Sequence, residues 1–251
     1  MTLRTVPADV LAAVRFLTRI PVPDTAYDPD ALARSVVYFP LVGLLVGGLA
    51  VLVARVLEGH LARPFVALAV VLFLVLVTGG LHEDGLADAA DGFGGGWTRE
   101  RILLIMRDSR IGSYGAIALC LSLGARVLLL GTMAPGRVFG TLVAAQVLCR
   151  WTVLPLSAWL PSARMDAVGE GARLAGKTSW AAVGVGTVVA FGITGFLLRW
   201  NAIGPVIAVC IIVWVSGWLY QAKIGGVTGD CFGATCQVAE VAVYVCGAWI
   251  G

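Results

Sequence analysis

The apolar stretch VVYFPLVGLLVGGLAVLVARVL, residues 36–57, decides the fold class. Arg55, close to its end, is the only charged residue in it. A helix needs about 17–25 predominantly apolar residues to cross the hydrocarbon core of a bilayer. This stretch therefore predicts a transmembrane helix.

Five more clear apolar segments follow along the chain, at residues 65–81, 111–133, 138–160, 180–198 and 202–220. A seventh, at residues 234–250, carries Gln237 and Glu240, so it could span the membrane or lie partly in the interface. We find neither an internal repeat nor a low-complexity linker. The sequence predicts one domain over residues 1–251, an all-α polytopic membrane bundle of six to seven transmembrane helices.

The composition supports this class. Hydrophobic residues make up 59% of the chain and charged residues 13%, about half the usual share of a soluble domain. A water-soluble fold cannot bury so much apolar surface, whereas a lipid bilayer does not require it to be buried. The net charge of +3 is too small to indicate nucleic-acid binding.

Positive residues alternate between the two sets of loops. One set, formed by the amino terminus and the long loops, contains Arg4, Arg15, Arg19, Arg34, Arg99, Arg101, Arg107, Arg110, Arg164, Arg173, Lys177 and Lys223. The opposite loops contain only Arg63, Arg137 and Arg199. Lys and Arg concentrate in cytoplasmic loops, so we predict a cytoplasmic amino terminus, and an outside carboxyl terminus if the seventh segment spans.

The strongest local signal is the acidic run HEDGLADAADG, residues 82–92. On a helix that continues from the second span, Asp84, Asp88 and Asp91 fall on one stripe. No Lys or Arg lies between positions 81 and 97 to neutralise them. Oxygen-only ligands of this kind suit Mg²⁺ or Mn²⁺, and the alternative is a solvated acidic helix end. A zinc-protease interpretation is weak because Leu86 stands where HExxH has its second histidine.

The run RDSRIGSYG, residues 107–115, is the second signal. Arg107, Ser109 and Arg110 beside glycines at a helix start suit phosphate oxygens. Asp108 between them is a further candidate metal ligand. The alternative is an ordinary positive flank with a serine cap.

The third signal is KIGGVTGD, residues 223–230, in which glycines surround Thr228 and Asp230. Such a backbone can come close to a ligand, or it can be a turn between two helices. Asp230 follows the sixth span and Asp84 follows the second, so both should meet at the cytoplasmic mouth of the bundle. Arg150, near the middle of its span, should face the interior and serve in an ion pair or bind substrate phosphate.

These motifs together resemble the cobalamin synthase family, the adenosylcobinamide-GDP ribazoletransferases. The resemblance covers nearly the whole chain and rests on residues 16–23 (FLTRIPVP), 79–92 (GGLHEDGLADAADG), 105–112 (IMRDSRIG) and 225–230 (GGVTGD). Members of the family often carry Leu where this chain has Glu83.

The resemblance implies a reaction and a cofactor. A hydroxyl of α-ribazole, or of its 5'-phosphate, would attack the cobinamide-side phosphorus of adenosylcobinamide-GDP, and GMP would leave, with Mg²⁺ as cofactor. Arg107, Arg110 or Lys177 would offset the charge on GMP. The hydroxyl proton would pass to His82 or to a carboxylate such as Asp84 or Asp230.

The resemblance also implies a bacterial inner-membrane enzyme whose active site faces the cytoplasm, and a homo-oligomer is possible. Two other classes stay open at this point. The spacing of the acidic run is similar to that of CDP-alcohol phosphotransferases, which cleave a similar pyrophosphate. A divalent-cation transporter would need its carboxylates near the bilayer midplane, whereas these are expected at the cytoplasmic end.

Overall fold

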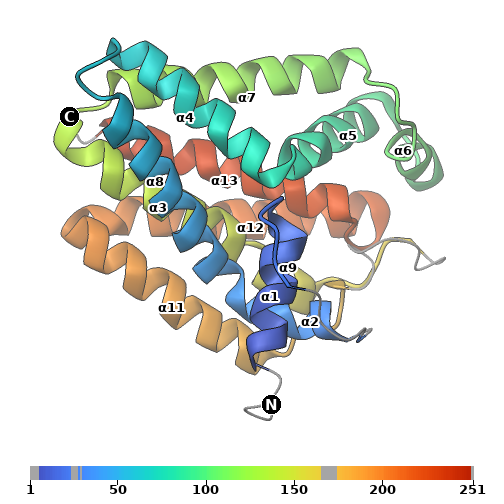
Figure 1. Cartoon of the computed structure of the whole chain (residues 1–251). Coiled ribbons are helices and arrows are strands. Elements are labelled where there is room, and N and C mark those ends of the chain that lie inside the picture. The colour runs from blue at the N-terminus through green and yellow to red at the C-terminus, as the bar shows by residue number, and fades with distance from the viewer. Residues whose placement is uncertain (1–5, 24–27, 29, 165–173, 250–251) are drawn as a thin grey trace.

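The computed structural model describes residues 6–23, 28, 30–164 and 174–249. In this part of the chain the regular elements are helices, and the only β-type pairings are two isolated bridges. The all-α prediction is therefore confirmed (Figure 1). The helices are α1 (Val6–Leu17), α2 (Ala31–Ser35), η1 (Val36–Tyr38), α3 (Phe39–Leu57), α4 (Arg63–Thr78), α5 (Leu81–Gly95), α6 (Arg99–Ile105), α7 (Ser113–Thr132), α8 (Pro135–Trp151), α9 (Val153–Trp159), α11 (Trp180–Leu198), η2 (Arg199–Ala202), α12 (Ile203–Ile224) and α13 (Gly229–Trp249).

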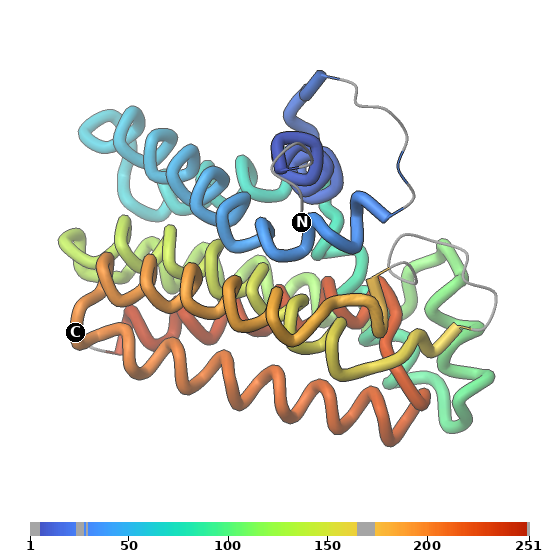
Figure 2. The backbone as a smooth tube through the Cα atoms, turned by 90° about the horizontal axis from the view of Figure 1, so that it is seen from below, coloured from blue at the N-terminus to red at the C-terminus, as the bar shows by residue number. Residues whose placement is uncertain are grey.

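Five helical stretches are long and apolar enough to cross a membrane, or six if the bent pair α4 and α5 forms one span. One of the five, Trp180–Ile224, is 45 residues long and contains α11, η2 and α12. A straight helix of that length would be about twice as long as the hydrocarbon core is thick. Figure 2 shows that the chain turns back between α11 and α12, so the stretch supplies two membrane crossings. The doubtful seventh segment, α13, passes the same test of length and composition.

Large apolar side chains cover the outside of the bundle. Leu72, Leu121 and Val188 are 56%, 68% and 74% exposed, on α4, α7 and α11. In water such a surface would drive aggregation, whereas in lipid it is the expected outer face. The polytopic membrane fold that the hydropathy predicts is thus confirmed.

Helix α8 forms the centre of the bundle together with α9: in the stretch Pro135–Trp159, which contains both, 78% of the most apolar 18 residues are buried. Helix α3 packs directly on α8 through small residues. A Cβ on Gly43 would collide with the backbone of Gln146, and one on Gly47 would lie 2.9 Å from the Cα of Val143. Small residues allow this close approach, on which helix packing in lipid depends.

The chain breaks sharply between α4 and α5. The two helices meet at 88°, and Gly79 and Gly80 at the junction have φ angles of 66° and 72°. This left-handed conformation favours glycine. The sequence predicts that the acidic run continues the helix of the second span. This prediction is wrong: the run forms a separate helix, α5. Figure 1 shows α5 lying beside α7 and α13.

Candidate active site

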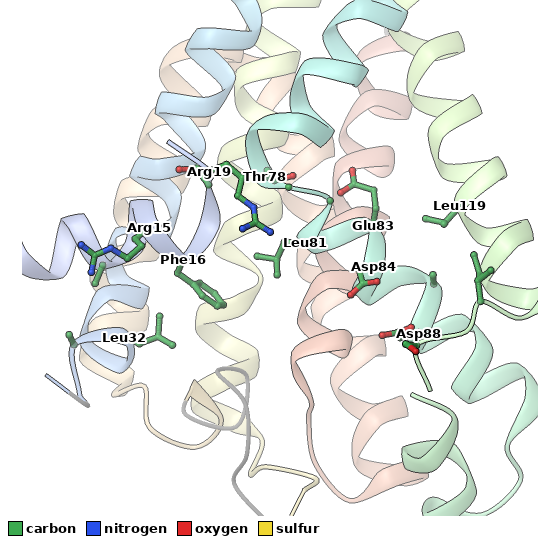
Figure 3. A pocket seen from close by; sticks show the side chains of 18 of the residues that line it. Arg15, Phe16, Arg19, Leu32, Thr78, Leu81, Glu83, Asp84, Asp88 and Leu119 are labelled. Atoms are coloured by element: carbon green, nitrogen blue, oxygen red, sulfur yellow. The ribbon is translucent and has the colours of Figure 1, made fainter. Parts of the chain in front are cut away.

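A large cavity, of about 940 Å³, lies between α1, the α4–α5 junction and the start of α7. The N-terminal segment provides one wall, and the polar face of α5 provides the other (Figure 3). The charged residues that line the cavity are Arg15, Arg19, Asp28, Glu83, Asp84 and Asp88. The N-terminal wall therefore carries two arginines beside Asp28, whereas the charged groups of the α5 wall are all carboxylates.

Asp84 and Asp88 are the two aspartates of the acidic run that line this cavity. They lie one turn apart on α5, and Figure 3 shows both carboxylates on the same side of the helix. Neither forms an ion pair with a Lys or Arg of the described residues. Two unneutralised carboxylates beside a cavity are what the sequence predicts for these positions.

The Asp91 carboxylate accepts hydrogen bonds from the backbone of the α7 segment. Its Oδ2 accepts a hydrogen bond from the backbone N–H of Gly112 at 2.7 Å, and its Oδ1 accepts one from Gly115 at 2.9 Å. A Cβ on either glycine would collide with the Asp91 carboxylate. Asp91 thus fastens α5 to the first turn of α7, and its place among the metal ligands stays a prediction.

Asp230 meets α5 from the opposite side, as the topology predicts. Asp84, His82 and Asp230 line a second cavity of about 280 Å³. The approach is close because glycines face each other: a Cβ on Gly85 would lie 3.0 Å from the carbonyl oxygen of Asp230 and 3.1 Å from the Cα of Gly233. The structure therefore places Asp230 and His82 beside Asp84, although 146 positions separate the two aspartates in the sequence.

The Asp230 carboxylate is held through one oxygen. Arg164 donates to its Oδ2 at 3.0 Å, and the Thr228 hydroxyl donates to the same atom at 3.2 Å. Thr228 also accepts from the backbone N–H of Cys231, so it caps α13. Thr228 is buried in the structure, so its contacts are with the protein, and a substrate-binding role for it stays a prediction.

The two carboxylates on the cavity wall are oxygen ligands of the kind that suits Mg²⁺. Mg²⁺ usually keeps several waters and binds through one or two carboxylates together with substrate phosphates. Asp84 and Asp88 meet that requirement on the wall of an open cavity.

The second predicted motif contributes less to the cavity than expected. Ser109 lines it, but Arg107 lies in a separate groove beside Arg99 and Arg164. Arg110 is 87% exposed and pairs with Asp108 at 2.6 Å. This bond lowers the pKa of the Asp108 carboxyl to about 2 and raises the pKa of Arg110. Asp108 therefore has an ion-pair partner within its own loop, and its role as a metal ligand stays a prediction.

Arg150 and Lys177 lie away from the residues that line the large cavity. Arg150 is 1% exposed and donates from Nη1 to Oε1 of Gln146 at 2.7 Å. Its inward orientation is as predicted, but its partner is an amide and a substrate has no access to it. Lys177 is exposed just before α11. Residues 165–173 of the same loop, including Arg173, lie outside the described ranges, as does Arg4.

Sequence reasoning missed two features of the site. Arg126 connects Glu83 on α5 with Glu240 on α13 inside the bundle. Arg19 reaches the cavity from the N-terminal segment. A signal existed for each: Arg126 and Glu240 are charges within apolar segments, and Arg19 belongs to the motif at residues 16–23.

The fold and site define a polytopic helical membrane protein with a carboxylate-lined cavity at a broken helix. A family model described as cobalamin-5-phosphate synthase matches residues 9–248, and the chain belongs to this family. Three similar proteins are each named adenosylcobinamide-GDP ribazoletransferase. That of Sinorhizobium medicae is 44% identical, with 94% of both chains covered. That of Rhizobium johnstonii is 41% identical, with 96% of both covered. That of Chlorobaculum tepidum is 36% identical, with 96% of this chain and 95% of the relative covered. No solved structure matches this chain significantly.

Proposed function

We propose that this protein transfers the adenosylcobinamide phosphate group from adenosylcobinamide-GDP to α-ribazole, or to α-ribazole 5'-phosphate, and releases GMP. Family membership supports the reaction class. The observation that carries the proposal in the structure is the cavity itself: Asp84 and Asp88 on one wall and arginines on the other suit a metal-bound pyrophosphate. Phosphoryl transfer depends mainly on positioning the reactants and on neutralising their charge. A metal at the two aspartates and the arginines of the opposite wall would do both.

The reaction forms one bond, breaks another and releases a proton, and each change needs a group in the site. The ribazole hydroxyl oxygen forms a bond to the cobinamide-side phosphorus while the bond from that phosphorus to the oxygen of GMP breaks. Mg²⁺ bound at Asp84 and Asp88 would neutralise the pyrophosphate and the departing GMP. The hydroxyl proton needs an acceptor within reach of the same phosphorus.

Asp230 is the acceptor that we favour over His82. Its two hydrogen bonds, from Arg164 and Thr228, both use Oδ2. Oδ1 is therefore available to a substrate hydroxyl or to the metal. His82 lines the same small cavity and is 6% exposed, so it is the second candidate for holding the proton.

We propose the bacterial cytoplasmic membrane as the location, with the cavity open to the cytoplasm. Figure 1 separates the loops into two ends: α4 and α8 begin, and α11 ends, near the carboxyl terminus, whereas α6 and the end of α12 lie at the other end of the bundle. The cation-rich loops lie at that other end, which supports a cytoplasmic orientation.

The test uses the purified protein in lipid nanodiscs with adenosylcobinamide-GDP, α-ribazole and Mg²⁺. We expect stoichiometric GMP and the corresponding cobalamin, and no GMP after chelation of Mg²⁺ by EDTA. Offering α-ribazole and its 5'-phosphate in competition identifies the preferred acceptor. GMP release without a ribazole-containing product would contradict the proposal, as would no reaction with either acceptor.

A further inference from the structure

Arg19 is the basic group of the large cavity that the chain's own contacts leave without a partner. Arg15, the other arginine of that cavity, donates to the carbonyl oxygen of Pro23 at 2.8 Å. Within the described ranges, the Arg19 guanidinium has no hydrogen-bond or ion-pair partner. An accessible, unpaired guanidinium at a cavity wall is available for a ligand anion.

The position of Arg19 is fixed by the break between α4 and α5. Its backbone N–H donates to the carbonyl oxygen of Val77 at 2.7 Å, which ties the N-terminal segment to the end of α4. Its side chain then passes over Gly79, where a Cβ would collide with the Arg19 Nε. Gly79 thus has two reasons to be glycine: its positive φ and the space that it leaves for this side chain.

The guanidinium faces the start of α5. Figure 3 shows Arg19 reaching over the junction on one side of Leu81, with Asp84 and Asp88 farther along α5 on the other side. Helix α5 begins at Leu81, and no side chain caps it. Its first N–H groups therefore add partial positive charge at the junction.

We infer that Arg19 binds the pyrophosphate of a nucleoside-diphosphate-linked substrate, while Asp84 and Asp88 take its metal ion from the other side. The inference rests on the proposed function and deepens it. A diphosphate carries enough charge and length to meet a cation at one wall and a carboxylate-bound metal at the other. A guanidinium matches phosphate oxygens in bidentate geometry, which an ammonium cannot do. Arg19 therefore takes the role that the sequence assigned to Arg107 and Arg110.

The test compares Arg19→Gln and Arg19→Lys with Arg101→Gln, which removes an exposed arginine of α6 that lines neither cavity. Initial rates of GMP release are measured while each substrate is varied. For Arg19→Gln we expect KM for adenosylcobinamide-GDP to rise about tenfold or more, because charge-assisted bonds to phosphate are strong. KM for α-ribazole should stay within about twofold. Arg19→Lys should fall between wild type and Arg19→Gln, and Arg101→Gln should match wild type.

Equilibrium binding of GDP in EDTA, without ribazole, gives a second readout that does not depend on turnover. We expect Arg19→Gln to weaken GDP binding by a similar factor. Unchanged GDP binding and unchanged KM in a folded Arg19→Gln protein would overturn the inference and leave the proposed function intact. A wild-type protein that binds GDP through Arg19 but transfers nothing to either acceptor would instead overturn the proposed function.

Discussion

Arg126 on α7 donates from Nη1 to Oε1 of Glu83 on α5 at 2.7 Å, and both residues are buried inside the bundle. The same guanidinium lies 3.3 Å from Glu240 on α13 and donates to Gln237 at 2.8 Å. Three helices therefore meet at one buried arginine. Glu83 immediately precedes Asp84, so this contact sets the height and rotation of the helix that presents the carboxylates to the cavity.

Replacing Arg126 should destabilise the protein strongly. Arg126→Met leaves Glu83 and Glu240 buried without their cation, and breaking a buried ion pair from one side costs about 3–5 kcal/mol. We expect a clearly lower midpoint of thermal unfolding in detergent and loss of GMP release. Arg101→Gln is the control for removing an arginine. An unchanged midpoint for Arg126→Met would show that the network does not hold α5.

Asp84→Asn and Asp88→Asn should affect the metal and not the fold. Each change removes one charged ligand from an accessible carboxylate, so the thermal midpoint should stay close to that of the wild type. The Mg²⁺ concentration for half-maximal GMP release should rise about tenfold or more, or turnover should be lost. Asp108→Asn, in the exposed loop, is the matched control. Normal Mg²⁺ dependence of both variants would remove these residues from the metal site.

Asp91→Asn should show the opposite pattern. An amide keeps one acceptor oxygen and turns an N–H group toward the other backbone donor, so one of the two bonds to Gly112 and Gly115 is lost. Leaving a buried donor unsatisfied costs about 1–3 kcal/mol. We expect a lower thermal midpoint and reduced turnover that extra Mg²⁺ does not restore. Restoration by Mg²⁺ at an unchanged midpoint would return Asp91 to the metal ligands.

Asp230→Ser separates a chemical role from helix capping. Serine is a good residue for the start of a helix, but it is a poor metal ligand and no base at neutral pH. We expect the protein to fold and GMP release to fall at least about a hundredfold, in the range that general base catalysis contributes. Near-normal GMP release at saturating Mg²⁺ would reduce Asp230 to a structural partner of Arg164.

The orientation in the membrane can be tested by cysteine labelling on a background without the six native cysteines. Arg99→Cys, Lys177→Cys and Lys223→Cys should resist a membrane-impermeant reagent applied to intact cells. Arg199→Cys, in the opposite set of loops, should react and serves as the positive control. Labelling at any of the first three positions, with Arg199→Cys unlabelled, would reverse the topology.

Hydropathy predicts the spanning segments well because the length of an apolar run depends only on local sequence. It does not predict the 88° break at Gly79 and Gly80, since a glycine pair is also compatible with a membrane helix. Helical spacing correctly places Asp84 and Asp88 on one face. The same spacing does not reveal that the Asp91 carboxylate also anchors α5 to the approaching helix α7. A partner from another helix is not encoded in local spacing.

The buried contact of Arg126 with Glu83 and Glu240 also has an evolutionary consequence. Because a lone charge is so costly inside a bilayer, positions 83, 126 and 240 should not vary independently during descent. In relatives with Leu at position 83, Glu240 would remain as the carboxylate partner of Arg126. A lineage that loses both carboxylates should also have replaced the arginine, and the three positions should form one covarying group.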